Sequence, residues 1–343
     1  MNKYKQKITY LLLCSVVLAG VQLPVKAQEG SVESVEQTES LQNEEEPGSV
    51  DEAEGVEIIP SVLTTGRSLN EEQLAETIEV LGAQHVAEDN QLEVWGSDID
   101  RYTGNGSSDE SMVFSSALIE FMHEGYGVTV KVVTPENITE VSAETYANAA
   151  ITAGGKDLDI KIANVVVPVN GRGALAGIYL AMEHAGIEIN QEDIEIAELE
   201  VGKIEEVQIQ TGLTDEVVNL SIADMKRQVA VYIVEGKEIN DDSVQEIIRY
   251  VEEQQGLEFP EETVMTMSEL LLNFSKTKAA QDTDLDTTLH QYTETVLETG
   301  GQALEGLEST ITVQEERNWL QRTGDNVNGF FKGVGDFFTG LFS

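Results

Sequence analysis

The stretch NVVVPVNGRGALAGIYLAMEHAG, Asn164–Gly186, carries the strongest evidence on the fold. An apolar run at 165–167 leads into a glycine-rich turn, and the turn opens directly into a helical pattern. This succession is typical of a strand followed by a helix in an α/β sheet. The turn has two interpretations, a phosphate cradle or a tight packing corner.

The flanking segments indicate an α/β or α+β domain over residues 56–190. We expect strands at 56–63, 90–96 and 157–169, and helices at 68–82, 142–155 and 173–186. Ser68 and Glu71 have the spacing of a capping box, and Gly82 ends that helix. The block 111–135 predicts two antiparallel strands joined as a hairpin, which would make the sheet a mixed one.

Residues 191–323 read as an all-helical region. Helical spacing with acidic starts recurs at 215–236, 241–256 and 261–276, and it continues less regularly at 282–299 and 303–322. The stretch 194–201 stays ambiguous between strand and helix. We expect the apolar faces of these helices to pack on one another.

The amino terminus has the pattern of a secretory signal peptide over residues 1–27. Three lysines precede an apolar run at 8–21, and Val25-Lys26-Ala27 is an acceptable cleavage site. Cys14, the single cysteine, lies inside the apolar run after three leucines, which argues against a lipoprotein. The mature chain would then be secreted and would contain neither a disulfide nor a thiolate site.

The charge balance is strongly acidic, with 20 basic and 63 acidic residues and a net charge of −43. Such a chain lacks the density of lysine and arginine that neutralises phosphates, which excludes nucleic acid as a partner. Residues 28–55 contain ten acidic residues and no basic one, so we expect a disordered acidic leader there.

Several segments together resemble a known family. The signal peptide, SLNEEQLAETIEVLGA (68–83), the hairpin block, YANAAITAGGKDLDIKIANVVVPVNGRGALAGIYLA (146–181) and the aromatic carboxyl end are similar to the YpuA-like family of secreted Gram-positive proteins, classified as domain of unknown function 1002. The resemblance runs from about Val62 to the end. It implies an extracytoplasmic location and a hairpin, and it supplies no catalytic residues.

The glycine corner lacks the known nucleotide-binding motifs. Gly171, Gly173 and Gly177 are spaced G-x-G-x-x-x-G rather than G-x-G-x-x-G, and this turn contains no lysine followed by serine or threonine. Backbone N–H groups at the helix start, with Arg172 beside them, could still hold an anion. We therefore favour a packing corner and keep a candidate ligand or anion site at Asn170, Gly171, Arg172 and Gly173.

The sequence indicates no catalytic residue and no firm metal site. The four histidines form no H-E-x-x-H motif, and no G-x-S-x-G motif is present. Asp282, Asp284 and Asp286 resemble the start of a calcium loop, but Thr287 and Thr293 stand where a glycine and a glutamate are required. We expect no cofactor beyond weakly bound calcium.

The carboxyl-terminal residues 324–343 predict an amphipathic aromatic helix. Seven apolar side chains fall within an arc of about 140°: Phe330, Phe331, Val334, Phe337, Phe338, Leu341 and Phe342. Because four glycines weaken this helix, it needs a surface on which to form. Its own helical region, a protein partner and a membrane surface are the alternatives; we favour the first two, since the chain is so acidic.

These features suggest three hypotheses about function. The leading one is a secreted, cell-envelope-associated binding or interaction protein that is not an enzyme. The rival is an extracellular hydrolase or small-anion-binding protein whose site combines Asn170–Gly173 with the loop 102–108. The third is a calcium-dependent adhesion module.

Overall fold

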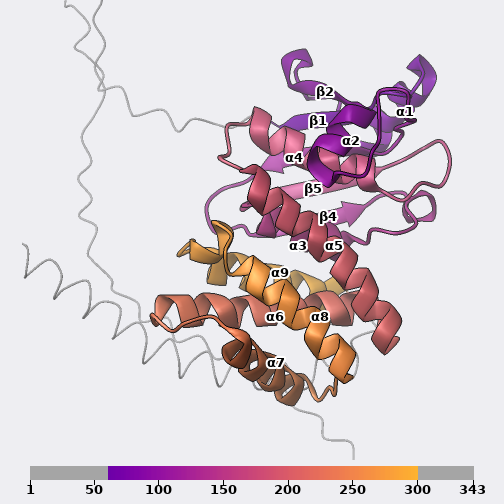
Figure 1. The fold of residues 1–343 in the computed structure, drawn as a ribbon. Helices are drawn as coiled ribbons and strands as arrows, with labels where there is room; N and C mark the ends of the chain where they lie inside the picture. Colours follow the sequence, from indigo (N-terminus) through magenta and orange to yellow (C-terminus); the bar gives the residue numbers. More distant parts are fainter. Residues whose placement is uncertain (1–60, 300–343) are drawn as a thin grey trace, which may run out of the picture. The chain divides into compact units, whose positions relative to one another are not determined.

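A mixed sheet of five strands forms the amino-terminal half of the computed structural model, which describes residues 61–299 (Figure 1). Its strands are β1 (Val62–Gly66), β2 (Gln91–Val94), β3 (Ser116–Phe121), β4 (Val128–Val132) and β5 (Leu158–Ala163). Their order across the sheet is β2-β1-β3-β5-β4. Only β3 runs antiparallel to its two neighbours, and the pairs β1–β2 and β4–β5 are parallel.

The helices of the described residues include four that belong to the sheet layer and five that follow it. They are α1 (Glu71–Leu81), α2 (Gly96–Thr103), α3 (Ala143–Thr152), α4 (Arg172–His184), α5 (Gln191–Thr211), α6 (Asp215–Val234), α7 (Asp241–Gln255), α8 (Glu261–Phe274) and α9 (Leu285–Thr299). This confirms the predicted class, a mixed sheet followed by a helical region. The ambiguous stretch 194–201 is helical, within α5.

The predicted hairpin is wrong in its pairing. Both strands of the block exist as β3 and β4, but β5 lies between them and bonds to each. The ends of the connection at 122–127 are held apart by β5: Met122 N donates to Asp157 O, and Leu158 N donates to Gly127 O, both at 2.8 Å. The spacing of the two strands predicted their existence but not the strand inserted between them.

Other predicted boundaries also need correction: the first strand runs to Gly66 and not 63, and the second ends at Val94, just before α2. The helix α1 is capped by Asn70, whose side chain accepts from Gln73 N at 3.0 Å, and not by Ser68. Ser68 Oγ instead accepts a hydrogen bond from Val113 N, in the loop that precedes β3. The strand predicted at 157–169 ends at Ala163. Beyond it, Asn164 Oδ1 accepts from Val166 N, which turns the backbone out of the sheet.

The two faces of the sheet are covered differently. One face packs α1 through a small cluster that includes Leu63, Leu118 and Leu81. The opposite face packs α4 across β1, β2 and β3, while α3 and α9 contact the edge strand β4. The core on this side continues without interruption into α5–α9. The predicted boundary between the two regions near residue 190 stays a prediction.

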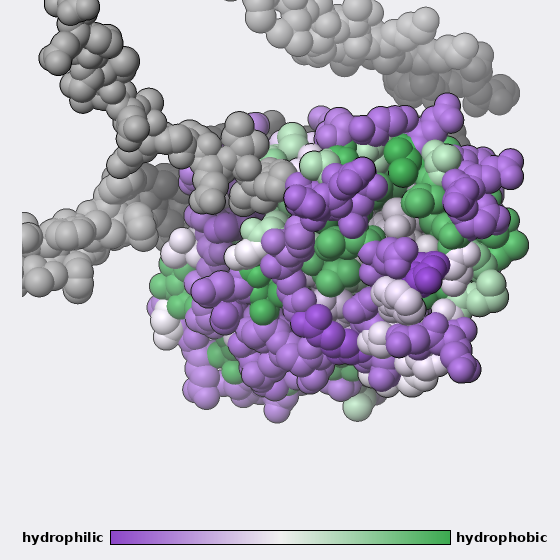
Figure 2. Space-filling view, turned by 90° about the horizontal axis from the view of Figure 1, so that it is seen from above, coloured by the Kyte–Doolittle hydropathy of each residue, from purple (hydrophilic) through white to green (hydrophobic). Residues whose placement is uncertain are grey.

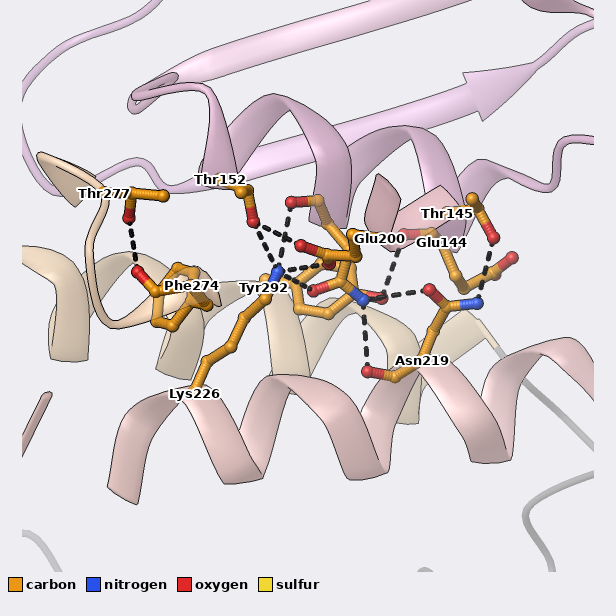
Figure 3. A network of polar contacts seen from close by, with 10 residues as sticks. Glu144, Thr145, Thr152, Glu200, Asn219, Lys226, Phe274, Thr277 and Tyr292 are labelled. Carbon is orange, nitrogen blue, oxygen red and sulfur yellow. Dashed lines mark hydrogen bonds and ion pairs between the residues drawn. The ribbon is translucent and has the colours of Figure 1, made fainter. Parts of the chain in front are cut away.

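A buried polar network joins the sheet layer to the helical layer (Figure 3). Lys226 on α6 is fully buried and forms an ion pair with Glu200 on α5. Its ammonium also donates to Thr152 Oγ1 on α3 at 2.8 Å and to Asn148 Oδ1 at 3.2 Å. Burial raises the pKa of Glu200 and lowers the pKa of Lys226, and the ion pair opposes both shifts.

Asn148 extends this network toward the last described helix. Its amide donates to Asn219 Oδ1 on α6 at 2.9 Å and to Tyr292 OH on α9 at 3.3 Å. Asn219 in turn donates to Thr145 Oγ1 at 3.1 Å. Each hydrogen bond has a direction and a length, so the network fixes how α3, α5, α6 and α9 are placed against each other more strictly than apolar contacts do.

The predicted signal peptide, the acidic leader, the segment 303–322 and the aromatic carboxyl-terminal helix lie outside the described residues. Among the helices within 61–299, none combines the length and the apolar character needed to cross a membrane.

Replacing Lys226 tests whether the ion pair holds the layers together. Lys226→Met leaves the Glu200 carboxylate buried without its cation, so we expect the free energy of unfolding in urea to fall by about 3–5 kcal/mol. Adding Glu200→Leu should recover more than half of that loss, because an apolar pair needs no desolvation. Lys203→Met is the control: Glu206 and Glu269, its partners, are exposed, so the loss should stay below about 1 kcal/mol. Equal losses in both single variants would contradict this account.

Candidate functional site

The carboxyl ends of β1, β2, β4 and β5 lie along one edge of the sheet, which we call the carboxyl edge. The loops that follow these strands, and the loop that precedes β3, meet there. In open α/β sheets ligands bind at this edge, because the loops that leave the strands frame a crevice there. The glycine corner 170–173 belongs to this edge, since it connects β5 to α4.

Gly171 is required by its backbone and by its surroundings. Its φ is +100°, a region that favours glycine. A Cβ atom would lie 2.2 Å from the Tyr146 hydroxyl, which donates to Gly171 O at 2.8 Å. The corner is therefore fixed from α3, through a buried tyrosine.

Gly173 and Gly177 let α4 approach the sheet closely. A Cβ on Gly173 would lie 2.7 Å from Val113 Cγ1, and one on Gly177 would lie 2.4 Å from Thr64 Oγ1 on β1. Both glycines face the sheet from the same side of the helix. The favoured interpretation of the corner, a close helix-to-sheet contact, agrees with this geometry.

A pair of glycine substitutions measures this contact. Gly177→Ala should lower the free energy of unfolding by about 1–3 kcal/mol, because the new methyl group overlaps Thr64. Gly202→Ala on α5 is the matched control, since a Cβ there meets no atom within 4 Å. It should raise stability by up to about 1 kcal/mol through helix propensity. Urea unfolding of both variants gives the signs, and a gain at Gly177 would contradict close packing.

Groups of the protein already occupy several of the donors at the start of α4. Asn170 Oδ1 accepts from Arg172 N at 3.1 Å, and Ser115 Oγ accepts from Ala174 N at 2.9 Å. The Arg172 guanidinium donates to Glu198 on α5 at 2.7 Å. An anion at this corner would have to compete with a carboxylate that the fold itself supplies. The anion site at Asn170–Gly173 stays a prediction.

Glu198 is a largely buried carboxylate. Burial raises its pKa, and the Arg172 charge opposes that rise. Burial also raises the pKa of Tyr146 and of Tyr179 well above the ordinary tyrosine value. Both phenols are therefore neutral at any physiological pH, and the one strong electrostatic contact of the cluster is Arg172 with Glu198.

Removing the arginine tests the role of this pair. In Arg172→Gln the Glu198 carboxylate loses its cation, so we expect a loss of about 3–5 kcal/mol near pH 7. Without the cation the folded-state pKa of Glu198 rises further above the unfolded value. The loss should therefore be largest at neutral pH and should shrink as pH falls and the carboxyl is protonated. Arg67→Gln, at an exposed pair with Glu93, should cost below about 1 kcal/mol at every pH. A pH-independent loss in Arg172→Gln would contradict this role.

The segment 102–108, predicted as a loop, begins in the last residues of α2 and lies against the same helix layer as the glycine corner. Tyr102 is buried, stacks edge-on against Tyr179 of α4 with ring centroids 5.5 Å apart, and donates to Glu183 at 2.9 Å. Farther along, Gly106 N donates to Asp100 Oδ1 at 2.6 Å. The two loops are thus not on opposite faces. The carboxylates near them are engaged, however: Glu183 also pairs with Arg101.

The acidic clusters bind cationic side chains or cap helices. Asp282 and Asp284 both pair with Lys156 at 3.2 Å, and Asp286 pairs with Arg227 at 3.1 Å. Asp98 accepts from Trp95 N at the start of α2. Within residues 61–299 no group of three or more histidine or acidic side chains is arranged to hold a metal ion. Weak calcium binding stays a prediction.

The comparisons with known proteins identify a family and no activity. The model of a family described as Protein of unknown function (DUF1002) matches residues 65–292. The chain belongs to this family. The match begins in β1 and ends in α9, so it covers the sheet, the carboxyl edge and the helical layer. Neither the curated proteins nor the solved structures gave a match.

In this DUF1002 chain, exposed apolar side chains occur at three loops of the carboxyl edge. Trp95 follows β2, Met112 precedes β3, and Val167 follows β5; they are 36%, 71% and 46% exposed. Arg67, after β1, lies over the Trp95 ring at 4.6 Å. Figure 2 shows that hydrophobic groups also lie among hydrophilic ones on the face seen from above, so the acidic surface is not uniformly polar.

The sequence analysis named neither Lys226 nor Glu198, although the pattern of α6 carries a signal for Lys226. Lys226 stands at a position that the apolar spacing of α6 assigns to the core, four residues after Ile222 and three before Val229. A charged residue in such a place predicts a buried partner. Glu198 gives no comparable signal, because α5 carries acidic residues on several faces.

Proposed function

We propose that the protein is a secreted, cell-envelope-associated binding protein, not an enzyme, and that it holds a protein partner on the carboxyl edge. The pattern of residues 1–27 supports the location. The observation that carries the binding role is that Trp95, Met112 and Val167 are exposed in loops along this one edge.

The composition of the edge suits a protein partner. Tryptophan, methionine and arginine are enriched where proteins bind each other, and a few such side chains dominate the binding energy. Arg67 is stacked on Trp95 and paired with Glu93 at 3.2 Å, so both an apolar surface and a polar rim are held in place.

The net charge of the chain also favours a protein over other classes of partner. A net charge of −43 repels polyanionic wall polymers and anionic lipid, whereas a protein can present apolar or basic groups to the edge. The donors at the glycine corner are partly used within the fold, which favours binding at the apolar rim over a small anion at Asn170–Gly173.

Site-specific crosslinking tests the proposal, because the mature chain would have no cysteine. Met112→Cys, labelled with a photoreactive group and added to washed cells, should give a discrete protein adduct. Met265→Cys is the matched control: Met265 on α8 is 68% exposed, close to the value of Met112, but lies away from the carboxyl edge. Combining Trp95→Ala with Met112→Ser should weaken retention on cells at least about tenfold, as expected for loss of two central contacts.

Truncation separates this edge from the aromatic carboxyl end. A chain that ends at Asn326 lacks Phe330–Phe342, the segment for which we predict partner contact. If truncation abolishes retention and the edge variants do not, the partner binds the aromatic end and the carboxyl-edge proposal fails. The same adduct from positions 112 and 265 would also count against it.

A further inference from the structure

The loop between α2 and β3 brings three groups together around one Asn-Gly bond. Asn105 is exposed, and the next residue, Gly106, has a φ of +78°. Asn105 Oδ1 accepts from Ser107 N at 2.9 Å, and Gly106 N donates to Asp100 Oδ1 at 2.6 Å. Both groups of a ring-forming reaction, the side-chain carbonyl and the following amide nitrogen, therefore have a polar partner.

The hydrogen bond from Ser107 folds the Asn105 side chain over the Gly106 peptide, as in an Asx-turn. A bond between Asn105 Cγ and the Gly106 nitrogen closes a succinimide ring, and glycine offers no side chain to obstruct that attack. The Ser107 N–H also points at the oxygen on which negative charge develops when Cγ is attacked. Donors aimed at such an oxygen lower the barrier to acyl transfer.

Asp100 provides the second element, a base at the nucleophile. An amide nitrogen attacks only as its proton leaves, and a carboxylate within hydrogen-bond reach can accept that proton. The 2.6 Å contact between Gly106 N and Asp100 Oδ1 satisfies this geometric condition. Asp100 belongs to α2, so the base is held by a helix and not by the loop itself.

We propose that Asn105 is a self-modification site, which cyclises with Gly106 and is converted to aspartate or isoaspartate, with Asp100 as the base. Gly106 N forms a bond to Asn105 Cγ, and the Cγ–Nδ2 bond breaks. The amide proton passes to Asp100 and then to the leaving nitrogen, which departs as ammonia. Water then adds to one of the two carbonyls of the succinimide ring. The product places a new negative charge in the loop that leads to Met112 and the carboxyl edge.

The chain contains its own control, the second Asn-Gly pair of the described residues, Asn170-Gly171. Asn170 is also exposed, and its Oδ1 likewise accepts from the N–H two residues on, at 3.1 Å. Within residues 61–299 no side-chain carboxylate accepts from Gly171 N. The two sites thus share the Asx geometry and differ in the base.

Peptide mass spectrometry of the folded chain, incubated in neutral buffer and sampled over weeks, tests the proposal. We expect the Asn105 peptide to gain the deamidation mass at least about tenfold faster than the Asn170 peptide, and faster than Asn105 in the urea-unfolded chain. Asp100→Asn should slow Asn105 to the rate of the unfolded chain and leave Asn170 unchanged. Asp109→Asn, which removes an equal charge from the loop that follows α2, should have no such effect.

Two outcomes would overturn the proposal. A folded chain in which Asn105 reacts no faster than in urea would show that the hydrogen bonds merely hold the loop still. An equal rate in Asp100→Asn, with the thermal unfolding midpoint preserved, would show that Asp100 is not the base. Ser107→Pro removes the second donor and, if that variant keeps its midpoint, it should slow Asn105 as well.

Discussion

The close approach of α4 to the sheet is the constraint on which the described fold depends. Gly173 and Gly177 leave no room for a Cβ between the helix and its neighbours Val113 and Thr64, so the helix axis is held at the distance that only glycine permits. This contact puts the start of α4 at the carboxyl edge and turns Arg172 toward α5. Tyr179 and Glu183, farther along the same helix, then meet Tyr102 of α2. One closely packed helix thus places the corner, the loop 102–108 and the first helix of the second layer.

The elements of the sequence were predictable where their signals are local. Periodicity predicted α1, α3, α4 and α6–α9, but it missed α2 and left the stretch 194–201 of α5 ambiguous. Gly82 marked the end of α1 because its φ of +71° is one that few other residues adopt. The position of β5 between β3 and β4 was not predictable in this way. Strand order depends on pairing between residues far apart in the chain, such as Phe121 with Leu158, and no local spacing encodes it.

In the candidate site, too, features with a local sequence signal were predictable and features that depend on distant residues were not. The glycines of the corner were recognisable, because a helix that starts on a glycine-rich turn has few alternatives. The role of Arg172 was not recognisable, because its partner Glu198 lies 26 residues away on a helix with acidic residues on several faces. The exposure of Trp95 and Met112 is equally non-local: an apolar residue next to a strand is usually buried, and only the assembled edge shows that these two are not.

The chain has few basic residues, and their placement explains how so acidic a chain stays folded. Basic residues within the described part of the chain pair across element boundaries: Arg101 joins α2 to α4, Arg172 joins α4 to α5, and Lys226 joins α5 to α6. Exposed pairs contribute little to stability, whereas a pair shielded from water fixes the partners it joins. Lys226 and Arg172 are the shielded cases of these three, so they hold the helical layers in register. Many of the remaining acidic residues are exposed, and their charge disfavours the approach of polyanions. A partner can then approach most easily where that surface is apolar, which is the argument for the carboxyl edge.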